Sequence, residues 1–137
     1  MKFVRYWLPV VAWMGVIFFL SGRSSVQVAQ EPLINFLFFK TLHVIEYSIL
    51  FVLYFRALKN TLRASIGINL LAVAFFLTLI YAVTDEIHQL FVPTREGRLR
   101  DVIIDAIGAS IAWISLTHLL PRSPKKLRAL AKSWGFI

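Results

Sequence analysis

Apolar residues form four long runs along this 137-residue chain, and most polar residues lie between the runs. The runs cover residues 6–20, 36–55, 66–83 and 102–120. Each approaches the roughly 20 residues that a helix needs to cross the hydrocarbon core of a bilayer. A soluble helical bundle would show a polar face on each helix, whereas Leu70–Val83 shows almost none. The pattern predicts an all-α membrane protein with four transmembrane helices in a compact bundle.

Prolines and polar connections set the expected helix ends. We expect helices over about residues 3–20, 32–58, 66–91 and 99–120, forming a transmembrane domain over residues 1–120. Pro32 suits the first turn of a helix, and Pro93 stops the third helix. Lys2 and Arg5 precede the first apolar run as they would in a signal peptide, but no convincing cleavage site follows. We therefore expect this helix to be retained.

Residues 121–137 form a basic tail with its own periodicity. On a helix, its basic residues lie opposite an apolar face made of Leu127, Leu130, Ala131 and Trp134. This pattern predicts a C-terminal amphipathic helix at the membrane interface, on the cytoplasmic side, and a disordered basic tail is the alternative.

The number and the positions of the charged residues indicate the partner of the chain and its orientation in the membrane. The net charge is +8, and the basic residues flank the apolar runs, which favours a lipid bilayer as partner and argues against nucleic acid. Both termini inside would place ten Lys and Arg residues in cytoplasmic segments and four in external loops, so we expect an N-in, C-in topology. The chain has no cysteine, which excludes disulfides and thiolate metal sites. The oligomeric state stays open.

Ionisable residues of three spans map to one depth in this topology, the outer leaflet. Each charge near a helix centre costs about 2.5–3.5 kcal/mol, so these groups must be shallow, paired or partly neutral. Helical geometry places them on faces turned toward neighbouring helices, with Glu86 further round, and Gly108 and Ala112 permit a close approach of helices. We expect an outward-facing polar pocket that binds a ligand through Lys40, His43, Glu46, Tyr47, Asp85, Glu86, His88, Gln89, Arg95, Asp101 and Asp105.

The same residues carry a family resemblance that spans about residues 10–118. The segments KTLHVIEYSIL, DEIHQLFVPTR and DVIIDAIGA resemble three motifs of the VanZ-like family, which is named for a teicoplanin-resistance protein. Three positions depart from the pattern: Asp105 stands where Asn is usual, Thr94 replaces a common Gly, and Phe39 replaces a frequent Asp. The resemblance implies a multi-pass protein of the bacterial cytoplasmic membrane, tied to the cell envelope and antibiotic resistance. It implies no particular reaction.

Three classes of function fit the expected pocket. The first is binding of an envelope lipid, a lipid-linked phosphate or a lipoglycopeptide. The second is acid–base or metal-assisted catalysis on a lipid-linked phosphate, with candidate residues Glu46, Asp85, Glu86, His88 and Asp101. A small oligomeric transporter or a structural membrane protein is the third. We expect no cofactor, and a divalent metal held by His43, His88, Asp85 and Asp101 is an alternative to a structural polar network.

Overall fold

The structure is a computed structural model that describes residues 2–23, 30–62, 69–93, 95 and 97–136. Its described part is helical and contains no strand. Four helical segments are long and apolar enough to cross a membrane: α1 (Lys2–Ser21), α2 (Pro32–Thr61), α3 (Leu70–Gln89) and the segment Leu99–Arg122, which begins with α4 (Leu99–Ile114). A shorter helix, α5 (Lys125–Ser133), follows. The expected all-α membrane-type fold is therefore confirmed.

Several helix ends differ from the expected ones. Helix α2 continues to Thr61, one turn beyond the expected end, and α3 ends at Gln89. The expected start of the third helix at Ile66 lies outside the described residues. The fourth span changes at Ser115 to a π-helical turn that runs to Leu119. Pro121 follows this turn and has no N–H to donate, which interrupts the regular α-helical hydrogen bonding.

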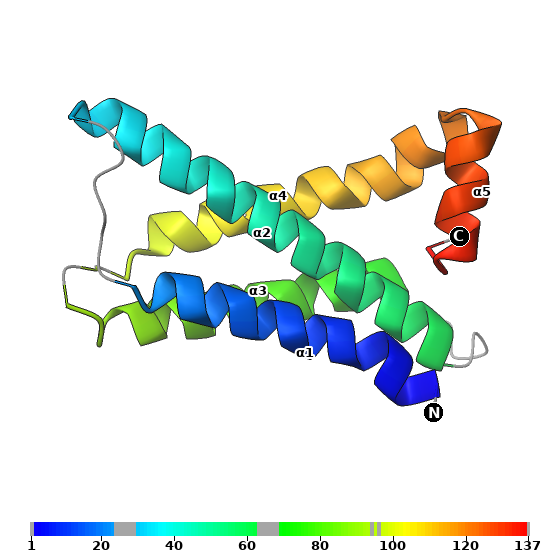
Figure 1. The fold of residues 1–137 in the computed structure, drawn as a ribbon, viewed down its shortest axis with the longest axis horizontal. Coiled ribbons are helices and arrows are strands. Elements are labelled where there is room, and N and C mark those ends of the chain that lie inside the picture. Colours follow the sequence, from blue (N-terminus) through cyan, green and yellow to red (C-terminus); the bar gives the residue numbers. More distant parts are fainter. Residues whose placement is uncertain (1, 24–29, 63–68, 94, 96, 137) are drawn as a thin grey trace.

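Helix α2 is the central element, because it packs against α1, α3 and α4. It crosses α4, and α3 packs against both of these helices, whereas α1 lies mainly against α2 (Figure 1). The N-terminus and the C-terminal helix lie at the same end of the molecule (Figure 1). We call this end the terminal end, and the opposite end, where α2 and α4 begin, the polar end.

The crossing of α2 and α4 depends on Gly108. A Cβ atom at this position would meet the main-chain oxygen of Val44 at 2.5 Å. The close approach also lets the Ser48 hydroxyl donate a hydrogen bond of 2.7 Å to the Gly108 carbonyl oxygen. The expected close approach at Gly108 is confirmed, and it brings the first turns of α4 against the middle of α2.

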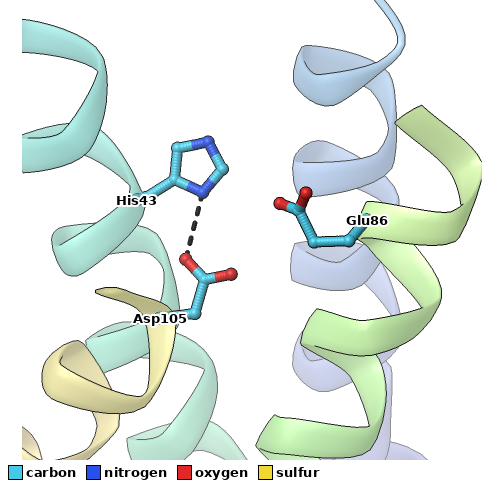
Figure 2. Close-up of side chains that lie close together, drawn as sticks. All are labelled: His43, Glu86 and Asp105. Carbon is cyan, nitrogen blue, oxygen red and sulfur yellow. Dashed lines mark hydrogen bonds and ion pairs between the residues drawn. The ribbon is translucent and has the colours of Figure 1, made fainter. Parts of the chain in front are cut away.

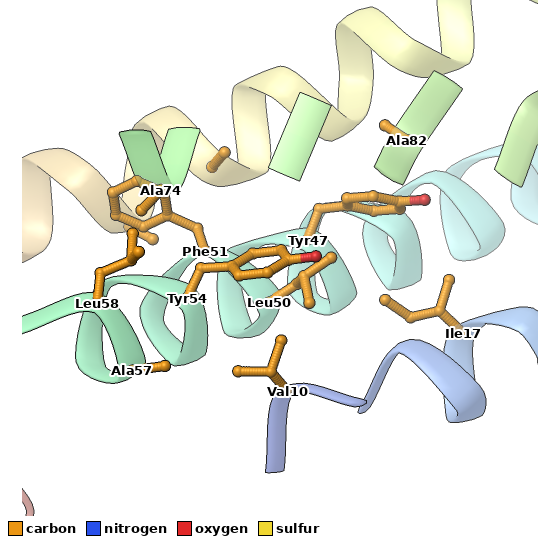
Figure 3. Close-up of a cluster of buried hydrophobic side chains, with 12 residues drawn as sticks. Val10, Ile17, Tyr47, Leu50, Phe51, Tyr54, Ala57, Leu58, Ala74 and Ala82 are labelled. Atoms are coloured by element: carbon orange, nitrogen blue, oxygen red, sulfur yellow. The ribbon is translucent and has the colours of Figure 1, made fainter. Parts of the chain in front are cut away.

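Apolar packing occupies the centre of the molecule and extends toward the terminal end. Its buried side chains from α1, α2 and α3 include Val10, Ile17, Leu50, Phe51 and Leu58 (Figure 3). Many other large apolar side chains are exposed on the outer faces of the helices, as the surface of a membrane-embedded protein requires. The interior near the polar end is different, because polar side chains fill it.

The C-terminal tail packs against the terminal end rather than standing apart. Main-chain carbonyl oxygens of Trp134, Gly135 and Phe136 accept hydrogen bonds from Arg56, Asn60 and Lys59 of α2. The predicted helix is present, although it ends at Ser133. Its apolar face lines a cavity of about 410 Å³ together with Leu116, Leu119 and Leu120 of the fourth span.

We predict that Gly108→Ala destabilises the protein by about 1–3 kcal/mol, because the added methyl group must push α2 and α4 apart. Unfolding in detergent, followed by circular dichroism, measures this loss. Gly15→Ala is the matched control, since nothing lies within 4 Å of a Cβ atom at that position. Equal stability of the two variants would contradict the role given to the crossing.

Candidate functional site

Polar side chains from all four spans meet at the polar end. They come from the last residue of α1, the first half of α2, the last turns of α3 and the first turns of α4. The side chains that make polar contacts with one another form a group here called the polar cluster: Ser21, Lys40, His43, Asp85, Glu86, Gln89, Asp101 and Asp105. Polar residues of all four spans thus meet at one end of the structure.

Two contacts between polar side chains join α2 to α4. The ammonium group of Lys40 lies 2.6 Å from a carboxylate oxygen of Asp101, and Arg100 lies 3.5 Å from the other oxygen. One turn further along both helices, Nδ1 of His43 lies 3.0 Å from Oδ1 of Asp105. The spacing of Lys40 and His43 matches that of Asp101 and Asp105 because residues three or four apart share a helix face.

Asp85 joins α1 to α3. The Ser21 hydroxyl donates a hydrogen bond of 2.5 Å to Oδ1 of Asp85, and the Gln89 amide donates one of 3.0 Å to Oδ2. Both carboxylate oxygens of this buried residue are therefore satisfied by neutral donors. Ser21 was not among the expected site residues, since it stood out in the sequence only as the end of an apolar run.

Glu86, which was expected in the pocket although further round the helix, is buried at the end of α3. One carboxylate oxygen accepts a 2.8 Å hydrogen bond from the main-chain N–H of Arg98, and the other lies 3.5 Å from the Gln89 amide. Gly97 makes this possible, because a Cβ atom there would clash with the main-chain oxygen of Glu86. The loop before α4 thus folds over the end of α3.

The remaining expected residues lie at the edge of the polar cluster. The His88 ring stacks on Phe18 of α1 with 4.0 Å between ring centroids. Glu46 lies beside the cluster on α2, and its main-chain oxygen accepts a hydrogen bond from the indole of Trp13. Tyr47 is fully buried, and its hydroxyl has no hydrogen-bond partner among the described residues.

The group best placed to hold a metal ion differs from the expected one. His43, Glu86 and Asp105 each offer a ligand atom, and these atoms lie within 4.8 Å of one another (Figure 2). Of the four residues expected as ligands, His43 alone belongs to this group. Asp85 is engaged by Ser21 and Gln89, Asp101 by Lys40, and His88 by Phe18.

Basic side chains lie against aromatic rings at the rim of the polar cluster. Lys40 and Arg100 lie over the ring of Phe36, at 5.8 and 5.0 Å from its centroid. Arg95 lies 5.8 Å from the ring centroid of Phe39 and donates a hydrogen bond to the main-chain oxygen of Arg23. The first turns of α2 therefore hold three cations next to a buried acidic interior.

Comparison with known proteins gives one match. The family model VanZ/LLP1 matches residues 6–120, which include all four spans almost completely. No curated protein and no solved structure matches the chain. The motif resemblance noted in the sequence is therefore supported by a match over most of the chain.

We predict that Asp101→Asn destabilises the protein and that adding Lys40→Met recovers much of the loss. The single change leaves a partly buried ammonium group without its carboxylate, whereas the double change removes both charges. A double-mutant cycle of unfolding free energies should give a coupling of about 0.5–3 kcal/mol. Additive effects of the two changes would show that the ion pair is not formed.

Proposed function

The chain belongs to the VanZ/LLP1 family, and from its polar end we propose that it binds an amphiphile of the cell envelope with an anionic headgroup, a lipid-linked phosphate. The protein would hold the headgroup at the rim of the polar cluster and the hydrocarbon chain along α2. A lipoglycopeptide is the second ligand of this kind, since it too is an amphiphile with an apolar chain.

The observation that carries the proposal is the placement of Lys40, Arg95 and Arg100. The aromatic rings of Phe36 and Phe39 hold these cations at the mouth of the polar cluster. Arginine binds phosphate oxygens through paired hydrogen bonds, and the side chain of Arg100 is 53% exposed and so accessible to a headgroup. Lys40 is 18% exposed and is already paired with Asp101, which leaves the two arginines as the main phosphate contacts.

An apolar surface for the chain of the ligand lies on the same turns of α2. A shallow cavity of about 450 Å³ follows the outer face of this helix and is lined by Ile34, Leu37, Phe38, Thr41, Leu42 and Ile45. Within a bilayer this apolar surface already contacts lipid chains, so contact with the hydrocarbon chain of the ligand would add little binding free energy. The headgroup contacts would therefore supply most of the specificity. The adjacency of cations and apolar surface on one helix suits an amphiphile.

Orientation in the membrane completes the proposal. The terminal end carries Arg56, Lys59 and the basic residues of α5, and the N-terminus lies there too (Figure 1). Cytoplasmic segments of membrane proteins are rich in Lys and Arg. We therefore place the terminal end in the cytoplasm of a bacterium and the polar end at the outer surface of its cytoplasmic membrane.

We predict that the purified protein binds a polyisoprenyl monophosphate at least tenfold more tightly than the polyisoprenol of the same length. The combined change Arg95→Gln and Arg100→Gln should weaken binding of the phosphate by tenfold or more, because hydrogen bonds to charged groups contribute about 1.5–3 kcal/mol. Native mass spectrometry or fluorescence quenching in detergent measures both affinities.

The matched control for this binding experiment removes two cations at the terminal end, by Lys125→Gln and Arg128→Gln. This control should leave the affinity for the phosphate unchanged. Equal affinity for phosphate and alcohol would overturn the proposal, and so would equal losses in the two pairs of variants. Tight binding of a lipoglycopeptide without binding of the phosphate would favour the second ligand.

Topology can be tested directly because the chain contains no cysteine. We predict that Arg98→Cys reacts with a membrane-impermeant maleimide in intact cells, whereas Lys126→Cys reacts only after the cells are opened. The main-chain hydrogen bond from residue 98 to Glu86 is kept in the first variant. The reverse labelling pattern would place the polar end in the cytoplasm and contradict the orientation.

A further inference from the structure

We propose that His43, Glu86 and Asp105 bind one divalent metal ion inside the membrane-spanning domain, an inference that goes beyond binding of an amphiphile. The three residues come from α2, α3 and α4, so the ion would join three helices. Figure 2 shows the three side chains pointing toward one shared space between these helices.

The spacing of the three side chains fits a metal ion. Their ligand atoms lie within 4.8 Å of one another. Metal–ligand distances of about 2.0–2.2 Å place the ligand atoms of a tetrahedral site roughly 3.3–3.6 Å apart. Small rotations of the side chains would close that difference, since Glu86 has a long and adjustable side chain.

An unsatisfied oxygen of Asp105 gives a second and independent indication. Asp105 is fully buried, with an exposed fraction of 0%. Its Oδ1 lies against His43, but its Oδ2 has no hydrogen-bond partner among the described residues. In Figure 2 the oxygen of Asp105 that carries no dashed line is turned toward Glu86. Buried carboxylate oxygens almost always have a partner, and a cation at this point would supply one.

Charge balance favours a divalent ion. Two carboxylates and a neutral imidazole carry a charge of −2, which a divalent cation cancels. An uncancelled charge inside the membrane is costly. The ammonium group of Lys40, on the same face of α2, lies 2.6 Å from Asp101 and is thus already engaged. A metal ion would neutralise the inner pair of acids as Lys40 neutralises the outer one.

The ligand set indicates which metals would bind. One imidazole nitrogen with two carboxylate oxygens suits Zn²⁺ or Mn²⁺. Three protein ligands leave at least one coordination position for water or for an oxygen of another molecule. The rim cations Lys40 and Arg100 lie one helical turn away along α2 and α4, since they contact Asp101.

Metal titration of the purified chain tests this proposal without any lipid phosphate present. After treatment with a chelator, the protein in detergent is titrated with Zn²⁺ and with Mn²⁺ by calorimetry, and bound metal is counted by mass spectrometry after dialysis. We expect one ion per chain for at least one metal. The same metal should raise the thermal unfolding temperature, because it binds the folded state.

Two single variants and a matched control make the result specific. Asp105→Asn and Glu86→Gln keep the shape of each side chain, and each should lower metal affinity at least tenfold and reduce the shift in unfolding temperature. Glu31→Gln removes an exposed carboxylate at the same end of the molecule, where its side chain caps no helix, so this control should retain the affinity. Circular dichroism establishes that each variant is folded.

Absence of stoichiometric metal in the unaltered protein would overturn the proposal, and so would equal affinity in the three variants. The outcome is separate from that of the phosphate experiment, because each titration uses its own ligand and different residues.

Discussion

The structure at the polar end depends on one constraint, which is that an ionisable side chain within a membrane needs a partner. Each acidic residue of the polar cluster meets a donor or cation on another helix or loop. Asp85 takes Ser21 from α1, Glu86 takes the main-chain N–H of Arg98, and Asp101 takes Lys40 from α2. These pairings determine how the four helices come together at that end. Elsewhere apolar packing holds the helices together.

Two glycines make the pairings geometrically possible. Gly108 lets α4 approach α2 closely enough for the Lys40–Asp101 ion pair and the His43–Asp105 contact to form on the turns before it. Gly97 lets the loop before α4 pass over the end of α3, where the next residue donates its N–H to Glu86. Small residues at helix contacts serve this purpose in many membrane proteins, because they allow backbones to approach closely. Here the approach serves a polar rather than an apolar contact.

The fold and the gathering of polar residues at one end of the helices could be predicted from the sequence because both depend on local patterns. Apolar runs of membrane-spanning length specify the helices, and the spacing of Lys40 with His43 and of Asp101 with Asp105 specifies shared faces. Which residue pairs with which could not be predicted. Helical geometry gives the direction of a side chain but not the rotation of one helix against another.

Three particulars show this limit. Glu86 was expected in the pocket, but the loop at Gly97 that covers it, and the hydrogen bond that it accepts from the main-chain N–H of Arg98, were not expected. His88 was expected as a metal ligand, but the end of α1 supplies Phe18, on which the imidazole stacks. Ser21 carried no sequence signal beyond its place at the end of a helix. Its partner Asp85 lies 64 residues further along the chain, so the contact could not be read from local spacing.

Disulfide cross-linking across α1 and α3 tests most directly whether the helices meet through their polar residues. The natural chain has no cysteine, so Ser21→Cys combined with Asp85→Cys introduces a single pair where a 2.5 Å hydrogen bond now lies. Mild oxidation in native membranes should cross-link this pair efficiently, whereas Ser21→Cys with Thr84→Cys, on the exposed face of the same turn, should stay open. Equal cross-linking of both pairs, or of neither, would contradict the convergence of the spans at the polar end.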